Sequence, residues 1–153
     1  MTEVNGPMVV VDEAAVSRNI AQMFRTALLL TASVERAETA LLQAIQSLHP
    51  DDSLADGLLR ETVRASTRAS VGLPEQQEEE LKQASSMVPC ELQHVLRLPR
   101  DLRLCFVLRF LVGLSRRVCA RLLHVKLSQI DEDTFAALRQ LSTFTNYLAL
   151  QSA

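Results

Sequence analysis

The sequence is poor in aromatic residues. It contains no Trp, one Tyr and five Phe among its 153 residues, and none of them stands between Phe24 and Phe106. Proteins that hold unpaired bases usually stack them on aromatic rings, and each stack is worth roughly 1 to 3 kcal/mol. The segment between these two phenylalanines therefore has no rings on which bases could stack.

Glycine is scarce as well, and strand-like alternation is missing. The chain has four Gly and five Pro, and shows no regular alternation of Val, Ile and Thr with polar residues. Abundant Ala, Leu, Arg, Glu and Gln favour helices. With 48% hydrophobic residues, the chain can also bury a core. We therefore predict an all-α fold.

Sequence signatures of catalysis and metal binding are missing. Cys90, Cys105 and Cys119 are odd in number and lack the spacing of metal ligands, so we expect small buried residues in a reducing compartment. His49 and His94 have no partner at ligand spacing, and no glycine-rich phosphate loop is present. We expect no catalytic residue, no metal and no cofactor.

Targeting and membrane-spanning patterns are missing too. The first residues, MTEVNGPMVVV, do not combine a basic segment with a long apolar run, and no apolar run has membrane-spanning length. We therefore expect a cytoplasmic protein without membrane contact.

The formal net charge of −2 does not indicate a general binder of polyanions, but the charge is uneven. Glutamates gather at 75–80. In the stretch 97–126, farther along the chain, Asp101 is the one acidic residue among many basic ones. This asymmetry serves an acidic partner, or it lets the acidic segment pair with the basic helices. The basic residues are Arg97, Arg100, Arg103, Arg109, Arg116, Arg117, Arg121 and Lys126.

Apolar periodicity in the front half predicts three helices. The first covers 12–30, and Ser33 is a cap for a second helix that ends at His49 and Pro50. Ser53 caps a third helix that runs to about Ala69. The short connection at 31–33 predicts an antiparallel hairpin of the first two helices.

The third predicted helix carries Arg60, Arg64 and Arg68 at intervals of four residues. Arginines at this spacing share one helix face. Such a ridge either follows phosphates or is an ordinary solvated face.

The back half predicts a helix-turn-helix. A break at 71–74 precedes a short polar helix and an approach helix over 89–97. Pro99 suits the first turn of a helix that Gly113 ends, Ser115 caps a short helix through Leu123, and Ser128 caps the last helix after a tight connection. The last helix would be the one that enters the DNA major groove.

The last helix begins with three carboxylates, at Asp131, Glu132 and Asp133. Acidic residues in a first turn complement the helix dipole, and Asp131 can form a capping-box-like pair with Ser128. Carboxylates also repel phosphates, whose contacts supply much of the affinity of DNA-binding proteins. We therefore predict that this helix reads DNA weakly.

An apolar stripe continues along the last helix. Such a stripe has to be covered by the front half of the chain, by a second copy or by a partner helix. Its members are Phe135, Leu138, Leu141, Phe144, Tyr147 and Leu148.

Two stretches resemble extracytoplasmic-function sigma factors, the promoter-reading subunits of bacterial RNA polymerase. The stretch 98–138 follows the pattern of their last domain, from a Leu-Pro pair and an Arg through an apolar helix to Gly-Leu-Ser and the recognition helix. These parts fall on Leu98, Pro99, Arg103, Phe106 to Leu111, Gly113, Leu114, Ser115, Ala120, Leu122, Leu123, Val125 and Ile130.

The stretch 23–48 resembles the first part of the polymerase-binding sigma domain. Thr39 and Leu42 stand where the family has Asp and Gln, polar residues of the surface that meets the polymerase. The positions that agree are Leu30, Thr31, Arg36, Ala37 and Glu38.

The resemblance implies two small helical bundles. Residues 12–70 would resemble sigma region 2, residues 71–88 would form a linker with a short polar helix, and residues 89–153 would resemble the helix-turn-helix of region 4. The implied partners are the core RNA polymerase or an anti-sigma-like regulator, while DNA binding and a homodimer stay open.

The leading hypothesis is a divergent sigma-factor-like protein of bacterial transcription regulation that acts through protein contacts. The alternatives are a functional sigma factor that binds promoter DNA and core polymerase, and a helical adaptor or dimerisation module unrelated to polymerase. The candidate residues for DNA contact are Arg116, Arg117, Arg121, Lys126 and Gln129. The candidate residues for protein contact are Arg103, Arg109, Phe135, Leu141, Phe144 and Tyr147.

Overall fold

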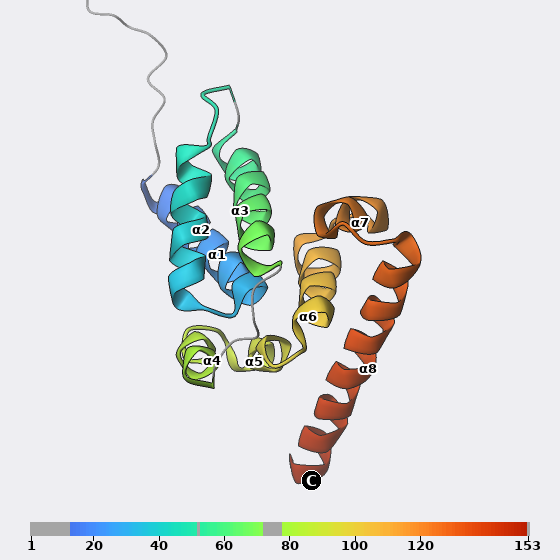
Figure 1. The fold of residues 1–153 in the computed structure, drawn as a ribbon. Coiled ribbons are helices and arrows are strands. Elements are labelled where there is room, and N and C mark those ends of the chain that lie inside the picture. Colours follow the sequence, from blue (N-terminus) through green and yellow to red (C-terminus); the bar gives the residue numbers. More distant parts are fainter. Residues whose placement is uncertain (1–12, 52, 72–77, 153) are drawn as a thin grey trace, which may run out of the picture.

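The structure is a computed structural model that describes the backbone of residues 13–51, 53–71 and 78–152, and side chains as far as residue 143. Within these ranges the chain forms helices and their connections, and no strand (Figure 1). The prediction of an all-α fold is confirmed.

Three helices form the front half: α1 (Glu13–Thr31), α2 (Val34–Gln46) and α3 (Leu54–Ser70), which pack against one another (Figure 1). Both predicted caps are confirmed. The hydroxyl oxygen of Ser33 accepts a hydrogen bond from the backbone N–H of Arg36 at 3.3 Å, and that of Ser53 accepts from Asp56 at 3.2 Å. Each bond satisfies one backbone donor that a helix start leaves unpaired.

Two short helices connect the halves, α4 (Glu78–Ser85) and α5 (Cys90–Leu96). They follow each other beneath the front bundle (Figure 1). The predicted polar helix and approach helix are therefore present, although the residues 72–77 lie outside the described part of the chain.

The predicted apolar helix after Pro99 is present, but its geometry changes midway. It begins as α6 (Arg100–Phe106) and continues as the π-helix η1 (Val107–Val112). Gly113 then ends it with a left-handed φ of 87°, as predicted. The N–H of Leu114 donates back to the carbonyl of Leu108 at 2.9 Å, which closes this widened turn.

Two helices complete the chain, α7 (Arg116–Leu123) and the long α8 (Leu127–Ser152). Ser115 caps α7 as predicted, and accepts from the N–H of Val118 at 3.3 Å. The predicted cap at Ser128 is wrong, because α8 begins one residue before it. His124, with a φ of 56°, turns the chain within three residues, and the carbonyl of Lys126 accepts the first helical bonds.

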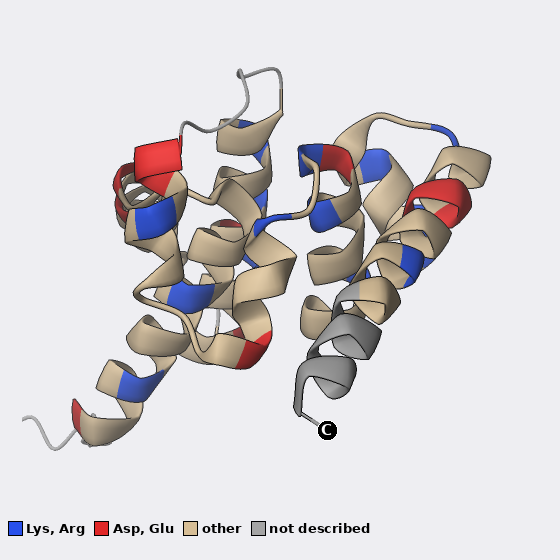
Figure 2. Ribbon diagram, turned by 90° about the horizontal axis from the view of Figure 1, so that it is seen from below, with Lys and Arg blue, Asp and Glu red and all other residues tan. Residues whose placement is uncertain are grey.

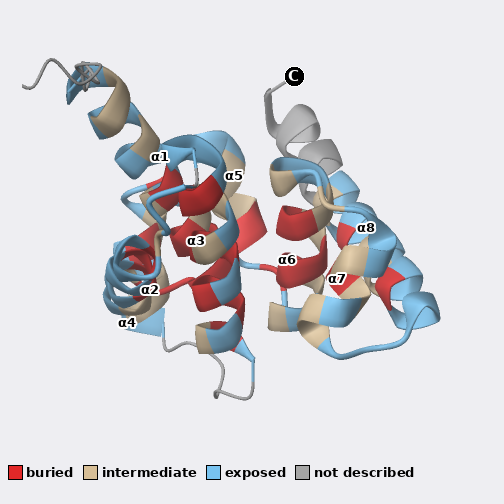
Figure 3. Ribbon diagram, turned by 90° about the horizontal axis from the view of Figure 1, so that it is seen from above, coloured by how far each residue is buried: buried red, intermediate tan, exposed pale blue. Residues whose placement is uncertain are grey.

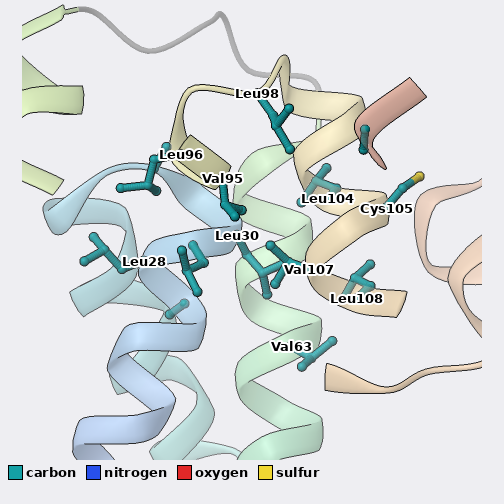
Figure 4. Close-up of a cluster of buried hydrophobic side chains, with 14 of the residues drawn as sticks. Leu28, Leu30, Val63, Val95, Leu96, Leu98, Leu104, Cys105, Val107 and Leu108 are labelled. Atoms are coloured by element: carbon teal, nitrogen blue, oxygen red, sulfur yellow. The ribbon is translucent and has the colours of Figure 1, made fainter. Parts of the chain in front are cut away.

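The apolar interior runs through both halves (Figure 4). Leu30 of α1, Val63 of α3, Val95 of α5 and Val107 of η1 belong to one cluster of buried side chains. Figure 3 shows buried residues on α1, α3 and α6 where these helices face each other. Ile130 of α8 joins the same cluster and is fully buried. The two halves therefore pack directly, and a domain boundary at 71–88 stays a prediction.

Candidate functional site

The candidate site surrounds α7, the helix that stands between α3 and the start of α8. Arg116, in the first turn of α7, meets Asp131, in the first turns of α8. Nε of Arg116 donates to Oδ1 of Asp131 at 2.7 Å, and Nη2 donates to Oδ2 at 2.6 Å. This paired geometry is the strongest arrangement of an arginine and a carboxylate. The hydrogen bonds, with the negative charge, raise the pKa of Arg116.

The other two carboxylates at the start of α8 differ in environment. Asp133 is half-buried, and its Oδ1 accepts a hydrogen bond from Nε2 of Gln129 at 2.9 Å. Its Oδ2 lies 4.0 Å from Sγ of Cys105, a buried residue of α6. Glu132 is exposed. The first turns of α8 therefore carry three carboxylates, shown in red in Figure 2, of which Asp131 is paired with Arg116 and Asp133 is turned toward α6.

The cysteines agree only in part with the prediction that all three are buried. Cys105 and Cys119 are buried, whereas Cys90 is exposed at the start of α5. Burial, and after it the charge of Asp133, raises the pKa of Cys105 to about 12. Burial also raises the pKa of Cys119, against the opposing charge of Arg109. Both buried thiols are therefore protonated at neutral pH. In the part of the chain that the structure describes, no three Cys, His, Asp or Glu residues gather as metal ligands.

Two of the five predicted DNA-contact residues already have hydrogen-bond partners within the chain. Arg116 is held by Asp131, and Gln129 by Asp133. Arg121 lines a cavity against α3, while Arg117 and Lys126 are exposed. Only the Arg116 bond joins two helices, α7 and α8, because Gln129 and Asp133 both belong to α8.

Arg103, predicted to contact a partner, is instead an interior residue. Only 2% of its surface is exposed. Nη2 donates to the carbonyl of Leu30, at the end of α1, at 3.4 Å, and Nη1 donates to the carbonyl of Leu98 at 3.5 Å. The hydroxyl of Ser70 donates to the same Leu30 carbonyl at 2.8 Å. Arg103 therefore links α6 to the front bundle, and the sequence prediction is corrected.

Arg109 is also engaged within the chain. It is half-buried, and Nη1 donates to the carbonyl of Leu114 at 3.3 Å. The guanidinium therefore supports the backbone just after Gly113, where η1 gives way to α7. Its predicted contact with a partner stays a prediction.

The predicted apolar stripe of α8 divides between interior and surface. Leu141 packs against the shared core. Phe135 is 67% exposed, and the guanidinium of Arg139 lies over its ring, 5.8 Å from the ring centre. Leu138 is also exposed. The predicted side-chain contacts of Phe144 and Tyr147 lie outside the described residues.

The sequence did not indicate the groove between α3 and α7. It consists of two adjoining cavities that share Arg64 and Leu122, with volumes of about 260 and 420 Å³. The smaller is mainly apolar, and the larger contains three arginines. The smaller is lined by Asp56, Leu59, Arg60, Val63, Arg64, Val112, Leu114, Val118 and Leu122. The larger is lined by Arg64, Thr67, Arg68, Val71, Arg121, Leu122 and His124.

No described helix combines the length and the apolar character that crossing a bilayer requires. No protein-family model, no curated protein and no solved structure matches the chain.

Proposed function

We propose that the chain is a divergent sigma-factor-like protein that acts in bacterial transcription regulation through protein contacts, with weakened reading and melting of DNA. The observation that carries this proposal is the paired hydrogen bonding of Arg116 and Asp131. A side chain that would meet a phosphate is held by a carboxylate of the helix that would enter the groove. A phosphate would have to displace this carboxylate and approach Glu132 as well.

The lack of aromatic residues supports the same conclusion for melted DNA. Between Phe24 and Phe106 the sequence offers no ring for an unpaired base. Phe106 of α6 and Phe110 of η1 contact each other, with ring centres 5.3 Å apart and ring planes tilted by 43°. The partners that we propose are the core RNA polymerase or an anti-sigma-like regulator.

The adaptor alternative has one observation in its favour. Phe135 and Leu138 lie exposed on α8, and large exposed apolar side chains often meet a second helix. A functional sigma factor that uses Arg116, Arg117, Arg121 and Lys126 is less well supported, because Arg116 is already engaged.

The test combines two assays on the purified full chain. One is a gel shift with a pool of random duplexes, and the other is run-off transcription with core polymerase on the duplexes that the pool yields. We expect no sequence-specific shift and no run-off product, and recovery of core polymerase or a regulator in affinity purification. A sequence-specific, salt-sensitive shift together with run-off transcription would overturn the proposal.

A further inference from the structure

We propose that the groove between α3 and α7 binds an acidic, amphipathic peptide segment of a partner protein. Its apolar part would occupy the smaller cavity, and its carboxylates would meet the arginines of the larger one. The inference deepens the proposed function and rests on it only in taking the partner to be a protein.

The smaller cavity is shaped for apolar side chains. Leu59 and Val63 of α3 line it together with Val118 and Leu122 of α7, and with Leu114 from the connection between η1 and α7. Its volume of about 260 Å³ accommodates one or two aliphatic or aromatic side chains. An apolar cavity of this kind gains stability when an apolar group displaces its water.

The larger cavity is basic, and the chain neutralises little of its charge. Arg64 and Arg68 of α3 line it together with Arg121 of α7. Arg64 lies 3.6 Å from Glu61, a carboxylate that also lies 3.4 Å from Arg60. Among the described residues, no carboxylate forms a salt bridge with Arg68 or Arg121. Arg68 and Arg121 therefore offer cationic groups with which the carboxylates of an acidic ligand can pair.

A peptide fits both cavities better than a nucleic acid does. A nucleic-acid backbone could meet Arg64, Arg68 and Arg121, but it has no aliphatic group for the apolar cavity next to them. The groove also has no Phe, Tyr or Trp on which a base could stack. A helix or turn with an apolar face and acidic neighbours matches both.

The test uses a fluorescein-labelled peptide designed as an amphipathic helix, with Leu on one face and Glu on the other. A matched peptide carries Lys in place of Glu, and a labelled single-stranded DNA represents the other class of occupant. Binding to the full chain is measured by fluorescence anisotropy. The double variant R64E/R121E is compared with R18E/R25E, which reverses two exposed charges of α1 and has the same net charge.

We expect the Glu peptide to bind the wild type and R18E/R25E alike, and R64E/R121E about tenfold or more weakly. A photoreactive group on the Leu face should cross-link to α3 or α7. The proposal is overturned if the Lys peptide binds as well as the Glu peptide, if R64E/R121E binds like R18E/R25E, or if the cross-links fall elsewhere. It is also overturned if the DNA binds and the peptide does not. None of these results depends on polymerase, so failure here is distinct from failure of the proposed function.

Discussion

Two arginines of the back half, Arg103 and Arg121, both face the front bundle, yet their surroundings differ. Arg103 is buried and donates to the backbone carbonyls of Leu30 and Leu98. Arg121 lines an open cavity with Arg64 and Arg68 and has no acidic partner among the described residues. At the contact between α1 and α6, which we call the closed contact, Arg103 is hydrogen-bonded within the chain. At the contact between α3 and α7, which we call the open contact, Arg68 and Arg121 form no salt bridge with a described carboxylate.

Packing explains the difference. Around Arg103 the space between α1 and α6 is filled by apolar side chains such as Leu30, Val107 and Leu108. Between α3 and α7 the side chains leave the groove unfilled. We therefore expect substitutions at the closed contact to change stability, and substitutions at the open contact to change binding.

The largest effect is expected for Arg103→Ala. The variant removes two hydrogen bonds and leaves a cavity between the halves, which should lower the free energy of unfolding by about 2 to 4 kcal/mol. Urea denaturation followed by circular dichroism measures the change. The control is Arg97→Ala, since Arg97 is exposed. Equal stability of the two variants would show that Arg103 does not hold the halves together.

The next effect concerns pH. The pKa of Cys105 is about 12 in the folded chain, above its ordinary value of 9.0. The folded state therefore keeps its proton while the unfolded state loses it, so this contribution is fully present below pH 9 and is lost as pH rises from 9 toward 12. We expect a fall of about 1 to 2 kcal/mol in the free energy of unfolding over this range.

The control for this pH effect is Cys105→Ser, which has no thiol to titrate. Its free energy of unfolding should fall less steeply with pH than that of the wild type. Parallel slopes in urea titrations would contradict the assignment. Thiol reagents should also modify the exposed Cys90 well before Cys105.

A smaller effect is expected at the end of η1, which leads into α7. Gly113 has a φ of 87°, and an added Cβ would meet no atom within 4 Å. Gly113→Ala should therefore cost about 1 kcal/mol through backbone strain alone. Gly113→Asn should cost less, because Asn tolerates this conformation. Thermal unfolding compares the two, and equal losses would argue against strain as the cause.

The smallest effect on stability is expected for R64E/R121E at the open contact. Arg64 is about half exposed, and Arg121 is exposed. The free energy of unfolding should change by no more than about 0.5 kcal/mol. A loss as large as that of Arg103→Ala in the same urea assay would remove the distinction between the two contacts.

Local signals in the sequence predicted much of the fold. Ser33, Ser53 and Ser115 marked helix starts and Gly113 marked a helix end because each acts on backbone groups within a few residues. The π-helix was missed because its residues, 107–112, carry an ordinary apolar helical pattern.

The candidate site was less predictable because it depends on contacts distant in sequence. Asp131 was predicted to act within its own helix, but its partner Arg116 lies 15 residues away. The groove requires α3 and α7 to meet, which neither segment encodes alone. Arg103 offered one signal, since it lies four residues before the buried Val107 and so shares its helix face.

The central proposal is that the acidic start of α8 weakens the reading of DNA by this helix. The most direct measurement is selection from a pool of random duplexes with the wild type and with Asp131→Lys/Glu132→Lys, at several salt concentrations. We predict no enriched sequence for the wild type, and for the variant a gain in DNA affinity that falls with added salt. An enriched motif bound by the wild type with residues 131–133 at the DNA would contradict the account.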